Sequence, residues 1–225
     1  MKNVIVTGAS KGIGYATARE FAQNGNKVLA IARNKEGLGK LKREHPENIL
    51  SLEADLSEGI NTDDVRSILT DVDIVIHNAG YLINKPFQKI SRAELQKSYQ
   101  VNVLAPFLLT QQLMPLLNKG AHIIMIGSVG GVTGTQKFAG LSAYSSSKAA
   151  LSCLAEVLQA EFADEDICFN SLALGAVQTE MLESAFPGYR ALVHPEAMAK
   201  YIFDFALNAP SVLRGQTIIV SRSNP

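Results

Sequence analysis

A tyrosine and a lysine stand four positions apart in the segment Tyr144-Ser-Ser-Ser-Lys148. Residues four apart on a helix share one face and are separated by a rise of roughly 6 Å, so the Lys148 ammonium can lie under a ligand that the Tyr144 phenol touches. Ser128 ends a strand-like run earlier in the chain, and a glycine-rich segment occupies 7–14. Together these residues predict a centre for proton transfer to a carbonyl beside a bound nucleotide.

The elements that must position these residues alternate along the chain. Seven short apolar runs have the length of strands: Val4–Val6, Val28–Ile31, Ile49–Leu52, Ile74–Ile76, Ile123–Ile126, Ile167–Leu172 and Thr217–Val220. Stretches with apolar residues at helical spacing lie between them: Ile13–Gln23, Lys35–Glu44, Asp63–Thr70, Ala93–Leu117, Ala149–Phe162 and Glu196–Leu207. This alternation predicts an α/β protein.

Strands that are apolar on both faces are typical of a parallel sheet covered by helices on each side. Right-handed crossovers would join about seven strands into a doubly wound sheet, and 225 residues fit a single domain. Ligands of such sheets bind beyond the carboxyl ends of the strands. The loops that hold Gly8, Asn78, Ser128 and Gly175 all fall at that edge, so one site is expected there.

The composition restricts the class of function. Hydrophobic residues make up 47% of the chain and charged residues 19%, which is enough apolar material for a large buried sheet. The 21 basic residues balance the 21 acidic ones, which argues against nucleic-acid or membrane-surface binding and favours a small-molecule substrate. Strand-like residues begin at Asn3 without a secretory leader, and no apolar run has the length of a membrane span, so a cytoplasmic protein is expected.

The cysteines and histidines give no sign of a disulfide or a metal site. Cys153 lies in a helical pattern and Cys168 in a strand pattern, each among core residues, so both are expected to be buried and unpaired. The four histidines, at positions 45, 77, 122 and 194, lack the close spacing that metal sites usually show. No metal is expected.

Gly8, Gly12 and Gly14 connect the first strand to the first helix. Glycines at this point allow a tight turn and bring backbone amides against a pyrophosphate at the helix N-terminus. The spacing, G-x-x-x-G-x-G, differs from the commoner G-x-G-x-x-G, and a plain strand-to-helix turn is the alternative interpretation. The loop alone is therefore only suggestive of a nucleotide site.

The second strand ends in Ala32-Arg33, without the acid that usually binds the adenosine ribose in NAD-dependent enzymes. Arg33, helped by Lys11 in the glycine loop, is expected to bind the extra phosphate of NADP instead, because a guanidinium suits phosphate geometry. The alternative is a pair of solvated surface cations.

Two further motifs follow the third and fourth strands. Asp55, in Ala54-Asp55-Leu56, is expected to accept a hydrogen bond from an adenine amino group, or else to cap the next helix. The small residues of Asn78-Ala79-Gly80 would let the backbone approach the middle of the cofactor, and a simple turn is the competing interpretation.

Taken together, these motifs resemble the short-chain dehydrogenase/reductase family. The resemblance extends through nearly the whole chain in the family's order, and it rests on Thr7-Gly8-Ala9-Ser10-Lys11-Gly12-Ile13-Gly14, Asn78-Ala79-Gly80, Asn102, Ser128 and Tyr144-Ser-Ser-Ser-Lys148. It implies a single NAD(P)-binding Rossmann domain over residues 1–225. The implied activity is hydride transfer between a nicotinamide cofactor and a carbonyl or secondary alcohol.

By position, the resemblance implies four catalytic residues. Tyr144 would be the general acid in carbonyl reduction and the base in alcohol oxidation, and Ser128 would hold the substrate oxygen. Lys148 would bind the nicotinamide ribose hydroxyls, and its charge and that of oxidised nicotinamide would lower the pKa of Tyr144 from about 10. Asn102, inside a long helix, would organise a water that relays protons to Lys148.

The resemblance also implies a cofactor site, with NADP(H) preferred and NAD possible. The implied cofactor-binding residues are Gly8, Ser10, Lys11, Gly12, Ile13, Gly14, Arg33, Asp55, Leu56, Asn78, Ala79, Gly80, Tyr144, Lys148, Gly175, Val177 and Thr179. A homodimer or homotetramer is expected, through the apolar faces of Ala93–Leu117 and Ala149–Phe162.

The chain departs from the family pattern in three places. Leu174 stands where the family commonly has a proline before Gly175, which predicts a less constrained loop. The substrate lid expected near 180–194 is short, which suggests an open cleft for a bulky carbonyl compound or a range of them. Val220-Ser221-Arg222 replaces the Asp-Gly-Gly of many members.

The same sequence argues against two other functions. A regulator that senses NADP without chemistry would not need Ser128, Tyr144 and Lys148 together. A methyltransferase with a related sheet would need an acid after the second strand, which Ala32-Arg33 does not supply. An NADPH-dependent carbonyl reductase is therefore the preferred interpretation.

Overall fold

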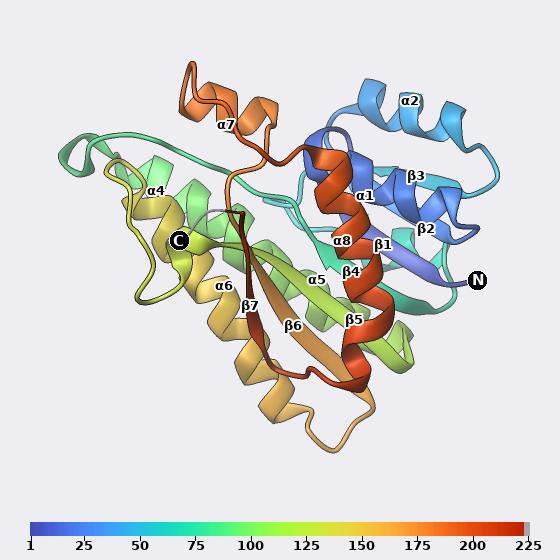
Figure 1. Cartoon of the computed structure of the whole chain (residues 1–225). Coiled ribbons are helices and arrows are strands. Elements are labelled where there is room, and N and C mark those ends of the chain that lie inside the picture. The colour runs from blue at the N-terminus through green and yellow to red at the C-terminus, as the bar shows by residue number, and fades with distance from the viewer. Residues whose placement is uncertain (223–225) are drawn as a thin grey trace.

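The computed structural model describes residues 1–222, and within them one parallel sheet lies between two layers of helices (Figure 1). Its strands are β1 (Asn3–Thr7), β2 (Lys27–Ala32), β3 (Ile49–Glu53), β4 (Val72–His77), β5 (Leu117–Ser128), β6 (Ile167–Leu174) and β7 (Thr217–Val220). Their order across the sheet is β3-β2-β1-β4-β5-β6-β7, and every neighbouring pair is parallel. The predicted doubly wound, Rossmann-like sheet of seven strands is confirmed.

Helices cover both faces of the sheet. They are α1 (Gly12–Gln23), α2 (Lys35–Glu44), α3 (Thr62–Arg66), α4 (Arg92–Tyr99), α5 (Ala105–Leu113), α6 (Ser142–Glu161), α7 (Glu180–Ala185) and α8 (Pro195–Asn208). Because side chains alternate along a strand, Val4 and Val6 share a core with α1, α2 and α8, whereas Ile5 shares one with α3, α5 and α6. Both faces of β1 are therefore buried, as the apolar run predicts.

The stretch 93–117 is not one helix, which corrects the sequence prediction. A π-helical turn, Gln100–Leu104, separates α4 from α5, and Leu117 already belongs to β5. Pro106 explains part of this break, because it has no N–H to donate to the carbonyl of Asn102 four residues earlier. Pro115, in a short 3-10 turn, precedes the start of the strand.

Other helices also differ from the prediction. The helix expected over 63–70 ends at Arg66, where the Ser67 hydroxyl donates to the Asp64 carbonyl and competes with the helical pattern. α6 begins at Ser142 rather than at residue 149, so Tyr144 and Lys148 lie in its first two turns. α7 was not expected as a helix, and the Thr179 hydroxyl caps its N-terminus by accepting from the Leu182 N–H.

The two cysteines differ in burial, although both were expected to be buried. Cys168 is buried and unpaired as predicted, but Cys153 is exposed on the outer face of α6, so the burial predicted for it is wrong. Helical periodicity placed Cys153 correctly on a helix but could not tell which face of that helix is covered.

In residues 1–222 no helix is both long and apolar enough to cross a membrane, and no group of three or more metal-ligating side chains gathers there.

Candidate active site

The predicted site residues gather around one cleft of about 830 Å³ at the carboxyl ends of the strands. Ser128, Tyr144 and Lys148 line it. The other predicted cofactor-binding residues that line it are Gly8, Ser10, Lys11, Gly12, Ile13, Arg33, Asp55, Leu56, Asn78, Ala79, Gly80, Gly175, Val177 and Thr179. Only Gly14 and Asn102, of the predicted residues, lie behind the wall of the cleft. The alternating pattern thus brings motifs from the ends of six strands, together with α6, to one edge of the sheet.

Gly14 packs closely against Gly8 of the glycine loop and against Asn78. A Cβ atom at this position would lie 2.3 Å from Asn78 Nδ2 and 2.4 Å from the Gly8 carbonyl oxygen, so no side chain fits. Asn78 Nδ2 in turn donates to the Thr7 carbonyl at 2.9 Å, which ties the end of β4 to the end of β1. Gly14 therefore allows a close contact that shapes the loop.

Thr7 completes this tie and was absent from the predicted site residues. Its hydroxyl oxygen accepts from the backbone N–H groups of Asn78 and Ala79, both at 3.0 Å. The two loops that border the middle of the cleft are thereby held together by buried polar contacts. The sequence signal that could have identified Thr7 was its position at the end of the first strand, directly before Gly8.

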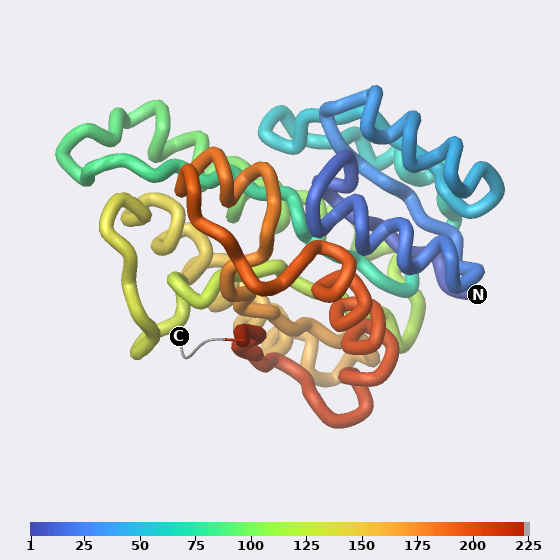
Figure 2. Tube along the Cα trace, turned by 45° about the horizontal axis from the view of Figure 1, so that its top comes forward, coloured from blue at the N-terminus to red at the C-terminus, as the bar shows by residue number. Residues whose placement is uncertain are grey.

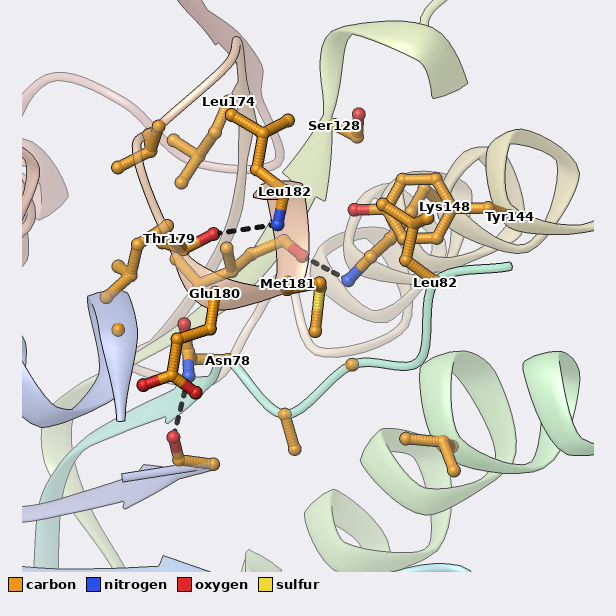
Figure 3. A pocket seen from close by; sticks show the side chains of 18 of the residues that line it. Asn78, Leu82, Ser128, Tyr144, Lys148, Leu174, Thr179, Glu180, Met181 and Leu182 are labelled. Carbon is orange, nitrogen blue, oxygen red and sulfur yellow. Dashed lines mark hydrogen bonds between the residues drawn. The ribbon is translucent and has the colours of Figure 1, made fainter. Parts of the chain in front are cut away.

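The Lys148 ammonium lies deep in the cleft. The side chain is buried, and Nζ donates to the Ile126 carbonyl of β5 at 2.7 Å (Figure 3). Burial disfavours the charged form and lowers the pKa of Lys148 to about 8. The amine therefore remains predominantly cationic at neutral pH, with two further donor positions beyond the one bound to Ile126.

The Tyr144 phenol lies beside this ammonium, with Lys148 Nζ 5.9 Å from the ring centroid. Burial raises the pKa of Tyr144 to about 12, although a hydrogen bond with Ser128 works in the opposite direction. Burial outweighs the Ser128 contact among the protein's own groups. The phenol is thus held protonated and able to donate. The lowering that the resemblance implies includes the charge of oxidised nicotinamide and stays a prediction.

The third predicted participant, Ser128, ends β5 close to α6. The next glycines form the short turn Val129–Gly131, and a Cβ atom on Gly131 would lie 2.8 Å from the Ala149 backbone nitrogen of α6. This close approach sets the strand end directly against the helix that carries Tyr144 and Lys148.

Asn102 is fully buried behind the cleft, on the π-helical turn rather than inside a long helix. Its side chain clamps the backbone of Tyr81: Oδ1 accepts from the Tyr81 N–H at 2.7 Å, and Nδ2 donates to the Tyr81 carbonyl at 2.9 Å. Nδ2 also donates to the Ser147 hydroxyl at 2.9 Å. The side chain therefore positions the loop after β4, and the predicted water relay to Lys148 stays a prediction.

Arg33 and Asp55 meet at the far end of the cleft. An Arg33 nitrogen Nη1 lies 3.4 Å from Asp55 Oδ2, and Asp55 Oδ1 accepts from both the N–H and the hydroxyl of Ser57. Burial raises the pKa of Asp55, but the Ser57 hydrogen bonds and the Arg33 charge outweigh it and leave that pKa below its ordinary value. The next helix, α3, is capped by Asn61, so the capping role considered for Asp55 is wrong.

α7 contributes Glu180, Met181 and Leu182 to the lining of the cleft. Figures 1 and 2 show the course of this short helix over the carboxyl ends of the strands. At its first residue, Glu180 pairs with Lys11 at 2.9 Å. At its last, the Ala185 carbonyl accepts from Asn84 Nδ2 at 2.8 Å. The short segment is therefore tied at both ends, an arrangement that no sequence signal revealed.

The loop after β6 is constrained although it lacks the family's proline. The Gly175 N–H donates to the Val220 carbonyl of β7 at 2.9 Å, and a Cβ atom on Gly175 would lie 2.5 Å from Ser221 Oγ. Sheet pairing thus restrains the backbone next to Leu174, and the looser loop expected from the sequence stays a prediction.

Comparison with known proteins places this site in a family. Residues 2–190 match the family model described as short chain dehydrogenase. An uncharacterized oxidoreductase of Staphylococcus epidermidis is 28% identical over 93% of this chain and 92% of its own. A fatty acyl-CoA reductase of Mycobacterium tuberculosis is 31% identical over 87% of this chain and 70% of its own.

A solved structure shows the same relationship. The crystal structure of a 3-ketoacyl-(acyl-carrier-protein) reductase from Brucella melitensis complexed with NADH has a TM-score of 0.88 and 25% identity, covering 98% of this chain and 96% of that one. The chain therefore belongs to the short-chain dehydrogenase/reductase family of oxidoreductases, as its motifs suggested.

Proposed function

We propose that the protein is an NADPH-dependent carbonyl reductase in which Tyr144 donates the proton. The observation that carries the proposal is the gathering of Ser128, Tyr144 and Lys148 in the cleft that the glycine loop borders. Burial keeps the Tyr144 phenol protonated, which a group that gives a proton must be. A fatty acyl-CoA reductase is among the relatives, which supports a reductase. The expected cytoplasmic location stays a prediction.

The residues present fit a dinucleotide. α1 begins at Gly12, no side chain caps its N-terminus, and no acid stands in its first turn. The backbone N–H groups of this turn therefore lack partners within the helix, and Gly12 and Ile13 line the cleft. A helix N-terminus of this kind is suited to binding a pyrophosphate. Hydride is the chemistry that a nicotinamide cofactor supplies when bound there.

The protein's own groups account for the proton. The Ser128 hydroxyl donates to the substrate carbonyl oxygen and fixes its position, and the Tyr144 phenol donates its proton to the same oxygen as negative charge develops there. The Lys148 ammonium, held by the Ile126 carbonyl, stabilises the phenolate that results and binds ribose hydroxyls with its remaining donors. In the oxidative direction the same groups act in reverse.

NADPH is favoured over NADH because two exposed cations, Lys11 and Arg33, line the cleft where β1 and β2 end. Both are paired with carboxylates, Lys11 with Glu180 and Arg33 with Asp55. A phosphate monoester carries close to two negative charges and three acceptor oxygens, so it is a stronger partner for a guanidinium than one carboxylate is.

Replacing Arg33 with aspartate is expected to raise the Kd for NADPH by roughly 10- to 100-fold, the value of one charge-assisted hydrogen bond of about 1.5–3 kcal/mol. The Kd for NADH should change by less than about threefold, since NADH lacks the phosphate. Fluorescence titration of both cofactors measures the two values. Lys35→Asp is the matched control, because Lys35 is exposed nearby and pairs with Glu53 outside the cleft. Equal losses for the two cofactors in Arg33→Asp would refute the phosphate assignment.

We also propose a homo-oligomer. Phe107 and Leu108 of α5 and Val157 of α6 are each more than two-fifths exposed, on helices that cover the same face of the sheet. Apolar side chains gathered on neighbouring helices favour burial against a second copy.

Light scattering at micromolar concentration should give about two or four times the chain mass of 24.2 kDa. Phe107→Arg should shift the mass toward a single chain, whereas Leu192→Arg, at an exposed apolar residue near the cleft mouth, should not. A single-chain mass for the unaltered protein would contradict the proposal.

A further inference from the structure

The walls of the cleft change character from one end to the other. The end bordered by β1, β2 and β3 carries the glycine loop, Arg33 and Asp55. The end formed by the loops after β4, β5 and β6 is lined mainly by apolar side chains: Leu82, Phe138, Leu141, Met181, Leu182 and Phe186. Tyr144 and Lys148 lie between the two ends, and Figure 3 shows Leu82, Met181 and Leu182 around them. The reacting carbon of a substrate would therefore enter from an apolar compartment.

Charge is distributed just as unevenly. The charged residues that line the described cleft are Lys11, Arg33, Asp55, Glu180 and Lys148. The first four form two ion pairs at the cofactor end or at the start of α7, and the Lys148 amine is bound to the Ile126 carbonyl. No charged side chain lines the compartment beyond Tyr144, so a substrate carboxylate or phosphate placed there would lose its hydration without gaining a partner.

The segment that covers the apolar compartment, from Met181 to Phe186, is held by hydrogen bonds. Asn84 donates to the Ala185 carbonyl at the end of α7, and its Oδ1 lies where a side chain on Gly140 would otherwise stand. The next residue, Lys85, donates its N–H to the Gly140 carbonyl at 2.9 Å. The loops after β4 and β5 and the end of α7 are thus joined at one point, which keeps Met181, Leu182 and Phe186 over the compartment.

We propose that the substrates are carbonyl compounds whose carbonyl carries an uncharged apolar chain, and that Met181 is a residue that determines this specificity. The inference rests on the proposed reductase function and deepens it. A chain of methylene groups gains free energy in proportion to the apolar area it buries, whereas a charged group on the same chain must remain outside the cleft.

The test uses methyl ketones of increasing length. For 2-butanone, 2-hexanone and 2-octanone, kcat/KM for NADPH oxidation should rise by about fourfold for each added methylene until the compartment is filled. The same series should bind to Tyr144→Phe protein saturated with NADPH, measured by calorimetry, with Kd falling by a similar factor. The binding measurement does not depend on turnover.

A charged analogue of equal length tests the absence of a cation. 2-Octanone should exceed 7-oxooctanoate, the same chain ending in a carboxylate, by more than about tenfold in both measurements. Met181→Lys should narrow this preference, because Met181 is 38% exposed and an ammonium there is tolerated and reaches the wall of the compartment. Ser184→Lys adds the same charge to α7 away from the lining and should leave the preference unchanged.

The outcomes separate the two proposals. Chain-length-dependent binding without turnover in the unaltered protein would refute the reductase function and support the apolar compartment. Turnover or binding that is independent of chain length, or a preference for 7-oxooctanoate in the unaltered protein, would refute the substrate class while leaving the reductase function standing. Equal effects of Met181→Lys and Ser184→Lys would remove Met181 as a specificity residue.

Discussion

Tyr144→Phe is expected to lower kcat for carbonyl reduction by about 10²- to 10⁴-fold, the usual contribution of a positioned general acid. The Kd for NADPH should remain within about threefold of its original value, because the phenylalanine ring keeps the packing of the first turns of α6 and only the hydroxyl is lost. The phenol is the group that the geometry equips for this step, since burial holds it protonated and Lys148 lies beside it.

Single-turnover absorbance at saturating NADPH measures the chemical step, and fluorescence titration measures cofactor binding. Tyr189→Phe is the matched control, because Tyr189 also lines the cleft but is 52% exposed at its mouth. That variant should retain kcat within about twofold. Turnover by Tyr144→Phe at the rate of the unaltered protein would remove Tyr144 from the reaction and with it the proposed mechanism.

The sheet was predictable from sequence because it is a local property repeated seven times. Each strand is an apolar run that ends at a polar or glycine-containing loop, and the parallel order follows from the helices between the runs. The glycine loop and the Tyr144–Lys148 pair were predictable for a related reason, since fixed spacings within one strand-to-helix turn or one helical turn determine which face the residues share.

The features that sequence reasoning missed depend on contacts between distant segments. The π-helical turn at Asn102 is stabilised by the Tyr81 backbone, and its only local signal was Pro106. Asn84 looks like an ordinary loop residue until the end of α7 lies next to it. The burial that raises the pKa of Tyr144 could not be read from the sequence either, because it is decided by the surrounding loops.

Two buried histidines predict a steep loss of stability in mild acid. His77 of β4 has Nε2 2.9 Å from the Thr110 hydroxyl, and burial lowers its pKa to about 3. His122 of β5 accepts at Nε2 from Asn170 Nδ2 and donates from Nδ1 to the Ala206 carbonyl, both at 3.0 Å, which is the pattern of a neutral imidazole. Burial lowers the pKa of His122 to about 4, although the Ala206 contact acts in the opposite direction.

In the unfolded chain both imidazoles take up a proton near pH 6.5, whereas in the folded protein they do so only at about pH 4 and about pH 3. Their contribution is therefore fully present above pH 6.5 and is lost as the pH falls toward the folded values. Between pH 6 and pH 5 the unfolded state binds nearly two more protons than the folded state, so the free energy of unfolding should fall by about 2.5 kcal/mol per pH unit.

Urea titrations across this range measure the slope of the free energy of unfolding against pH. His122→Gln should halve it whatever its effect on total stability, and exposed His194→Gln should leave it unchanged. A slope below about 1 kcal/mol per pH unit in the unaltered protein would show that these histidines are not buried as neutral groups.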